Sequence, residues 1–136
     1  MIQIVHMEME NLAEIFILVM LAIVFLQSGM DKVTDWKGNL GWLKGHFAKS
    51  PLKNMVPFSL FIITILEILS GLSAVAGIVS LATCGGNFFA WCSAVLSGVT
   101  FSLLFLGQRL AKDYPGAQGI VVYMIPTFFL LYILMN

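Results

Sequence analysis

Four long apolar stretches, separated by short segments that hold most of the polar residues, dominate this chain of 136 residues. Crossing the hydrocarbon core of a bilayer takes about 20 apolar residues in a helix, or somewhat fewer where the bilayer thins. Because backbone polar groups in hydrocarbon must be satisfied within their own segment, each stretch is predicted to be a helix. The sequence therefore predicts an all-α, polytopic membrane four-helix bundle. Its expected spans cover about residues 12–29, 56–81, 88–106 and 119–135.

The composition supports a membrane protein and narrows the functions available to it. Hydrophobic residues make up 60% of the chain and charged residues only 10%, whereas roughly a quarter of the residues in a soluble domain are charged. The length suits one integral-membrane domain over residues 1–136, with no room for a nucleotide-binding domain. The zero net charge gives no reason to expect a nucleic-acid partner.

The positive charges indicate how the bundle is oriented. In the predicted topology all seven Lys and Arg residues fall in the first and third loops, which lie on the same side of the membrane. The positive-inside rule makes that side cytoplasmic, so both termini are expected outside. The residues concerned are Lys32, Lys37, Lys44, Lys49, Lys53, Arg109 and Lys112.

The first loop has a helical pattern of its own. Asp31 or Thr34 can cap its start, and Ser50-Pro51 can end it. We expect an amphipathic interfacial helix over about residues 33–49, lying along the cytoplasmic membrane surface. Such a helix is most often a plain surface element, and less often a lid over a ligand or a docking site. Apolar residues recur at steps of three and four on one stripe, formed by Val33, Trp36, Leu40, Leu43 and Phe47.

Glu67 is the only charged residue in the apolar stretch from Met55 to Leu81. An ionised carboxylate in hydrocarbon costs several kcal/mol, and intramembrane carboxyls are commonly functional. Glu67 is either a neutral carboxyl hydrogen-bonded to a serine or a backbone carbonyl, or a group that handles a ligand or a proton. Ser97 and Thr127 are expected at a similar depth, whereas Arg109 is expected too near the cytoplasmic surface to pair with Glu67 directly.

Small residues on the second and third spans predict close helix packing, since helices in lipid approach one another at such residues. Close packing by itself explains most of these small residues, so they do not require a polar cavity between the two spans. The second span carries Gly71, Ser73, Ala74 and Gly77, and the third carries Ala90, Ala94 and Gly98.

The sequence offers no pattern for catalysis or metal binding. The spacing of Cys84 and Cys92 is neither that of a dithiol oxidoreductase nor that of a zinc site, and a disulfide between them stays open. His6 and His46 are expected at opposite sides of the membrane. We therefore expect no catalytic residues, no metal site and no intrinsic cofactor.

Several short motifs resemble those of the DoxX-like family of small bacterial membrane proteins. The run Gln27-Ser28-Gly29-Met30-Asp31-Lys32 closes the first span, Glu67 precedes Gly71 in the second, and Gly107-Gln108-Arg109 follows the third. The segments Asp35-Trp36-Lys37-Gly38-Asn39-Leu40 and His46-Phe47-Ala48-Lys49-Ser50-Pro51 resemble members from Bacteroidetes-type bacteria. The resemblance covers nearly the whole chain.

The resemblance implies a small four-helix bundle in the bacterial inner membrane. The termini, which the positive charges place outside, are then expected in the periplasm. Relatives in that family include a membrane subunit associated with thiosulfate oxidation, which passes electrons to quinone, and proteins linked to oxidative-stress complexes. The family's polar landmarks map to Lys32, Glu67 and Arg109. The chain has no dithiol motif to match the redox members of related folds, which argues against thiol chemistry of its own.

Two functions therefore remain. The chain is either an accessory subunit of a larger, redox-linked membrane complex, or a quinone- or lipid-binding subunit of a membrane oxidoreductase. We favour the accessory subunit. The accessory role predicts a solid interior, whereas the binding role predicts a cavity open to lipid beside Glu67. Expected partners are membrane lipids together with other membrane subunits or a second copy of the chain. The hypothetical quinone or lipid site comprises Glu67, Gln27, Lys32, Arg109 and Tyr123.

Overall fold

The computed structural model describes residues 11–83 and 85–136, and within these ranges the regular structure is entirely helical. Four of the helices are long and apolar enough to cross a membrane, namely α2, α4, α5 and α6. The predicted membrane four-helix bundle is therefore confirmed. The helices are α2 (Leu12–Thr34), α3 (Trp36–His46), α4 (Val56–Ala82), α5 (Phe88–Leu110) and α6 (Tyr114–Met135).

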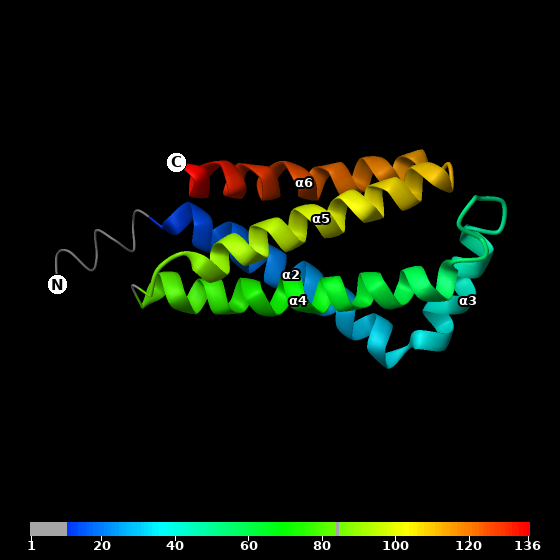
Figure 1. Ribbon diagram of the computed structural model, residues 1–136, viewed down its shortest axis with the longest axis horizontal. Coiled ribbons are helices and arrows are strands. Elements are labelled where there is room, and N and C mark those ends of the chain that lie inside the picture. Colours follow the sequence, from blue (N-terminus) through cyan, green and yellow to red (C-terminus); the bar gives the residue numbers. More distant parts are fainter. Residues whose placement is uncertain (1–10, 84) are drawn as a thin grey trace.

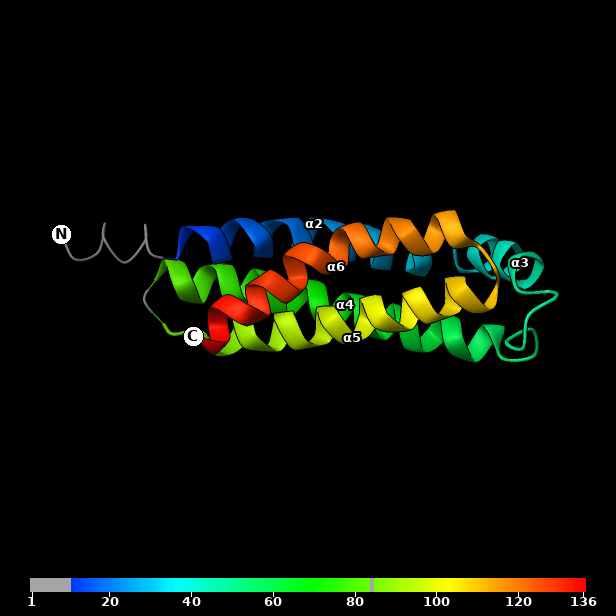
Figure 2. The same ribbon diagram turned by 90° about the horizontal axis from the view of Figure 1, so that it is seen from above.

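The four long helices run lengthwise beside one another, and the short helix α3 lies across one end of the bundle (Figure 1). Helix α4 packs most extensively against α2 and α5, while α6 packs mainly on α5 and less on α2. The turn between α5 and α6 lies at the same end as α3, and the start of α2 lies at the other end with the C-terminus (Figure 2). The first and third loops are thus at one end of the bundle, because two membrane-spanning helices, α4 and α5, lie between them in the chain.

Helix α2 continues past Gly29, where the first span was expected to end, and stops at Thr34. Val33 and Thr34 therefore belong to α2, and the interfacial helix is shorter than the predicted range 33–49. Asp35 provides its N-cap, because the carboxylate accepts a hydrogen bond of 3.3 Å from the backbone N–H of Gly38. The sequence missed this boundary because a single residue, Asp35, separates the two helices.

Helix α6 begins at Tyr114, before the expected start at residue 119. Pro115 was interpreted as a breaker ahead of the span, but it lies in the first turn of the helix, where its missing N–H has no intrahelical acceptor to lose. Asp113 caps this start by accepting a hydrogen bond of 3.0 Å from the N–H of Gly116. The third span likewise runs on to Leu110 rather than ending near residue 106.

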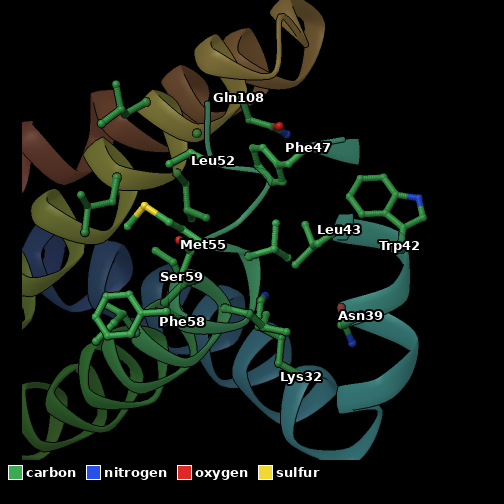
Figure 3. Close-up of a pocket in the computed structure, with 18 of the residues that line it drawn as sticks. Lys32, Asn39, Trp42, Leu43, Phe47, Leu52, Met55, Phe58, Ser59 and Gln108 are labelled. Atoms are coloured by element: carbon green, nitrogen blue, oxygen red, sulfur yellow. The ribbon is translucent and has the colours of Figure 1, made fainter. Parts of the chain in front are cut away.

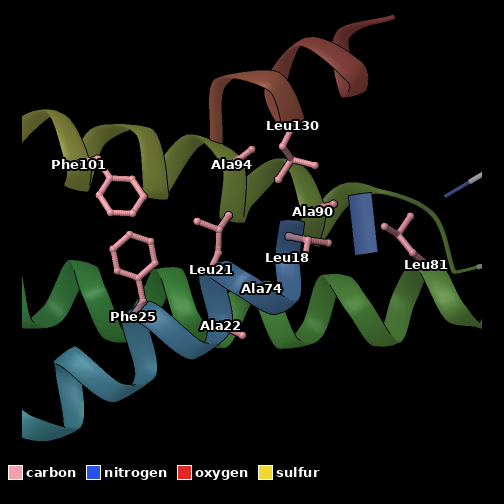
Figure 4. Packing of buried hydrophobic residues seen from close by; sticks show 10 residues of the cluster. All are labelled: Leu18, Leu21, Ala22, Phe25, Ala74, Leu81, Ala90, Ala94, Phe101 and Leu130. Atoms are coloured by element: carbon pink, nitrogen blue, oxygen red, sulfur yellow. The ribbon is translucent and has the colours of Figure 1, made fainter. Parts of the chain in front are cut away.

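The apolar core joins all four long helices (Figure 4). The rings of Phe25 on α2 and Phe101 on α5 lie 4.7 Å apart between centroids, a distance typical of favourable aromatic pairs. Along α5 the core residues end at Phe101, so the last turns of this helix lie beyond the core. The core comprises Leu18, Leu21, Ala22, Phe25, Ala74, Leu81, Ala90, Ala94, Phe101 and Leu130.

Two glycines let α4 approach its neighbours closely. A Cβ at Gly77 would lie 3.0 Å from the backbone nitrogen of Ala90, so α4 and α5 meet there backbone to backbone, as the small residues predict. Gly71 instead faces α2, because a Cβ there would lie 3.2 Å from the backbone nitrogen of Leu26. The small residues of α4 thus serve two neighbouring helices rather than α5 alone.

We predict that Gly77→Ala lowers the free energy of unfolding by about 1–3 kcal/mol, the usual cost of overpacking a close contact. The added methyl group would press on the backbone of α5, which cannot move aside as a flexible side chain can. Gly119→Ala is the matched control, because a Cβ at Gly119 meets nothing within 4 Å. Thermal unfolding in detergent micelles measures both variants, and equal midpoints would contradict the proposed contact.

Candidate functional site

An ion pair joins α2 to α4. The ammonium nitrogen Nζ of Lys32 lies 2.8 Å from Oε1 of Glu67 and donates a hydrogen bond of 2.7 Å to the hydroxyl of Ser28. The Glu67 side chain is only 2% exposed and that of Lys32 only 16%. Glu67 is therefore paired with a cation, and not with the serine or backbone carbonyl expected for a neutral carboxyl.

The pair forms because α2 ends beside the middle of α4. A Cβ at Gly29 would lie 3.8 Å from Cβ of Glu67, so the last turns of α2 are level with Glu67. Glu67 itself lies about three turns, or about 16 Å, from the start of α4. Lys32 follows Gly29 by one turn and reaches the carboxylate from there. The prediction that Lys32 belongs to the first loop is therefore wrong, since this residue lies in the last turn of α2.

The buried pair has few other polar contacts to compensate its burial. Although Oε1 of Glu67 is close to the ammonium, it accepts no hydrogen bond of good geometry from the described residues. Within those residues, Lys32 supplies the neutralising charge. Removing one member of a buried pair costs more than removing both, because it leaves an uncompensated charge. Each member of this pair therefore holds the other in place.

A cavity of about 400 Å³ lies beside the pair, at the end of the bundle that α3 covers (Figure 3). It exists because α2 ends soon after it passes Glu67, so that α3 and the following turn cover the ends of α4 and α5 instead. Most of the lining is apolar, contributed by α3 (Trp42, Leu43), the turn after it (Phe47, Leu52, Met55), α4 (Val56, Phe58, Leu60, Ile62, Ile63), α5 (Leu103, Leu104, Leu106, Gly107) and α6 (Ile120).

Four lining side chains are polar, namely Lys32, Asn39, Ser59 and Gln108. The described residues place no carboxylate in the lining, since Glu67 is not among the lining residues. The polar groups that reach the cavity are therefore one ammonium, two amides and one hydroxyl. An ammonium has only donors, and amides and hydroxyls both donate and accept, so the lining favours a ligand with hydrogen-bond acceptors.

The rim of the cavity includes exposed apolar side chains that would face lipid in a membrane. Phe58 at the start of α4 is 62% exposed, and Leu106 near the end of α5 is 52% exposed. Both residues also line the cavity. An amphipathic molecule can therefore keep its apolar part in contact with the bilayer while its polar part lies near Lys32.

The other predicted site residues lie elsewhere. Gln27 is exposed on α2, and the exposed guanidinium of Arg109 lies 4.5 Å above the ring centroid of Tyr114. Tyr123 stacks on Phe101 with ring centroids 5.8 Å apart. The structure thus brings together Lys32 and Glu67 from the predicted set, and Gln27, Arg109 and Tyr123 do not line the cavity.

Asn39 and Gln108 are cavity residues that the sequence reasoning did not assign to the site. Gln108 stands next to Arg109 in one of the family-like motifs, but spacing alone gives no reason to choose the amide over the guanidinium. Asn39 lies off the apolar stripe that defined the interfacial helix. The signal that could have found both is their position in the two loops that the topology places at one end of the bundle.

The hydroxyl residues of the interior mostly serve helix packing. Ser97 and Thr127, expected near Glu67, are both fully buried. Thr127 donates to the carbonyl of Tyr123 on its own helix, whereas the hydroxyl of Ser97 has no partner among the described residues. Between α4 and α5, Ser70 and Thr100 bring their hydroxyl oxygens to 3.4 Å. No recorded polar contact links these residues to Glu67 within the described chain.

The described residues contain no cluster of three or more His, Cys, Asp or Glu side chains that could hold a metal ion. Cys92 lies half-buried on α5, while His6 and Cys84 lie outside the described residues. Comparison with known proteins adds no assignment, since no family model, curated protein or solved structure matches the chain.

We predict that Glu67→Gln destabilises the protein by about 3 kcal/mol, because it leaves the ammonium of Lys32 without its counter-charge. The double variant Lys32→Gln with Glu67→Gln should recover most of this loss. Thermal unfolding of the wild type, both single variants and the double variant in one detergent gives the coupling energy. Additive losses in the double variant would show that the contact does not contribute to stability.

Proposed function

We propose that this chain binds an amphipathic, lipid-soluble molecule, a quinone or a membrane lipid, in the cavity beside the Lys32–Glu67 pair. The observation that carries the proposal is the cavity itself, which has an apolar lining, a few polar side chains from different helices and a rim of exposed apolar side chains. Small-molecule sites usually combine these features. A solid interior, which an accessory role alone predicts, is less consistent with this geometry.

The lining favours a polar group that accepts hydrogen bonds without carrying a full negative charge. Glu67 already balances the charge of Lys32, so an anionic headgroup would place a second negative charge near the same ammonium. A carbonyl oxygen needs only a donor, which Lys32, Asn39 or Gln108 can supply. Quinone carbonyls and lipid esters both meet this requirement.

The chemistry, in this proposal, belongs to a partner. The sequence motifs that resemble the DoxX-like family suggest a subunit of a redox-linked complex. We therefore propose a binding subunit of the bacterial inner membrane that acts with other membrane subunits or a second copy of itself. The positive charges on α3 and the turn after it, at Lys37, Lys44, Lys49 and Lys53, support a cytoplasmic location for this end.

We predict that Ile63→Trp lowers the amount of co-purifying quinone or lipid at least tenfold, because the larger ring fills the cavity that Ile63 lines. Ile65→Trp is the matched control, since Ile65 lies on the same helix but is 41% exposed and outside the lining. Mass spectrometry after gentle extraction measures the bound molecules and any co-purifying protein. Equal retention by both variants would exclude this cavity, and a stoichiometric protein partner without a bound small molecule would establish the accessory role instead.

The proposed orientation has a separate test. In a variant with Cys84→Ser and Cys92→Ser, a cysteine at Lys49 should react with a membrane-impermeant reagent only after the cells are permeabilised. A cysteine at Asn87, in the turn between α4 and α5, should react in intact cells. The opposite pattern would reverse the topology while leaving the bundle unchanged.

A further inference from the structure

Helix α3 forms part of the cavity wall but is weakly embedded in the bundle. None of its residues is buried, and Trp42, which lines the cavity, is 64% exposed. A Cβ at Gly41 or Gly45 would meet nothing within 4 Å. The helix thus packs on α2 and α4 through one half-buried face only, and the rest of its surface is exposed.

At its beginning, α3 is joined to α2 by a short connection. The side-chain amide of Asn39 donates to the carbonyl of Asp35 at 2.9 Å, with longer contacts of 3.4 Å to the carbonyl and the carboxylate of Asp31. These contacts lie within the connection itself. They fix where α3 leaves α2, but they do not attach the helix to α5 or α6.

At its end, α3 is attached to the turn between α5 and α6 through His46. Its Nε2 lies 2.8 Å from Oε1 of Gln108 and 3.6 Å from Oδ2 of Asp113. Both neighbours are acceptors, so Nε2 carries a proton and donates to Gln108. Phe47 packs beside Gly107, since a Cβ there would lie 3.6 Å from Cζ of the ring.

We propose that α3 is a lid over the cavity whose closure is controlled by the protonation of His46. When the imidazole is neutral, it keeps the hydrogen bond to Gln108. When it is protonated, it gains the attraction of the Asp113 carboxylate as well. Histidine is the side chain whose charge ordinarily changes between about pH 5 and pH 8. The lid is therefore held more firmly closed at the acidic end of this range.

The charged groups around His46 support a lid that is held more firmly at acidic pH than at alkaline pH. From the α5–α6 turn, Asp113 is the one carboxylate of the described residues within 4.0 Å of the imidazole. On α5, Arg109 directs its guanidinium over the ring of Tyr114. Lys112 in that turn and Lys44 on α3 are exposed, so solvent screens their repulsion of an imidazolium. On α3 itself, Trp42 stacks on His46 with ring centroids 4.6 Å apart.

Protonation of His46 affects the cavity because residues that contact the imidazole also line the cavity. Gln108 accepts from His46 and also lines the cavity, as do Trp42 and Phe47, which contact the imidazole ring. Releasing His46 frees the end of α3 and withdraws lining from the cavity. The consequence for ligand exchange rests on the proposed function, whereas the motion of α3 does not.

The test measures that motion directly. Spin labels at Lys44→Cys on α3 and Gln118→Cys on α6, in a background with Cys84→Ser and Cys92→Ser, report the distance between the two helices in nanodiscs. We expect the fraction of long distances to rise at least threefold between about pH 5 and pH 8. His46→Gln keeps an amide donor for Gln108 but no titrating charge, so its distance distribution should be the same at both pH values.

Asp113→Asn tests the partner separately. Asparagine preserves the cap of α6 but removes the charge, so the pH response should be lost. Asp35→Asn is the matched control, because it makes the same change at the cap of α3, where His46 has no recorded contact, and it should keep the full response.

Identical wild-type distributions at both pH values would overturn the lid, as would a pH response that persists in His46→Gln or Asp113→Asn. The spin-label experiment needs no ligand. If the lid moves while the native membrane yields no bound molecule, the proposed function fails and the lid stands. If a molecule is bound while the lid does not respond to pH, only the lid fails.

Discussion

The contact between Lys32 and Glu67 is the interaction on which the rest of this structure depends. A carboxylate placed about three turns into an apolar helix needs a counter-charge nearby, and α2 brings one in its last turn. Once α2 ends there, the remaining turns of α4 and α5 have no long helix on that side. Helix α3 and the turn after it cover these turns of α4 and α5 less completely than a long helix would. The space that they leave unfilled is the cavity.

The bundle consequently has two parts with different packing. Towards the end where α2 begins, glycines and alanines bring the helices into close contact around an apolar core. Beyond Phe101 the core ends, and the cavity begins among larger apolar side chains with a few polar groups between them. The ion pair lies between these two parts. It fixes the position of α2 against α4 and presents an ammonium to the cavity, so its structural and proposed binding roles use the same atoms.

The proposed lid, α3, is attached to the molecule less firmly than the two parts of the bundle are attached to each other. Close packing in lipid comes from small residues at helix contacts, whereas Gly41 and Gly45 of α3 face open space. The attachment of α3 to α5 and α6 therefore depends on the polar contacts of His46. Contacts of this kind respond to protonation, whereas the apolar core does not. Loss of the contacts between one imidazole and two acceptors would release the end of α3 without disturbing the four long helices.

The sequence by itself determined the four membrane helices, the grouping of the positive charges at one end and the position of Glu67 inside an apolar span, because hydropathy and charge placement act locally along the chain. It also identified a surface helix between the first two spans. Only the tertiary structure decided that Lys32 is the partner of Glu67, because this depends on where α2 ends relative to α4. The cavity, the involvement of Asn39 and Gln108, and the contact of His46 with Gln108 and Asp113 likewise depend on distances between segments that lie far apart in the chain. Spacing along a chain reports such distances only within one helix, so Gln27, Arg109 and Tyr123, chosen by depth and polarity, did not meet at the site.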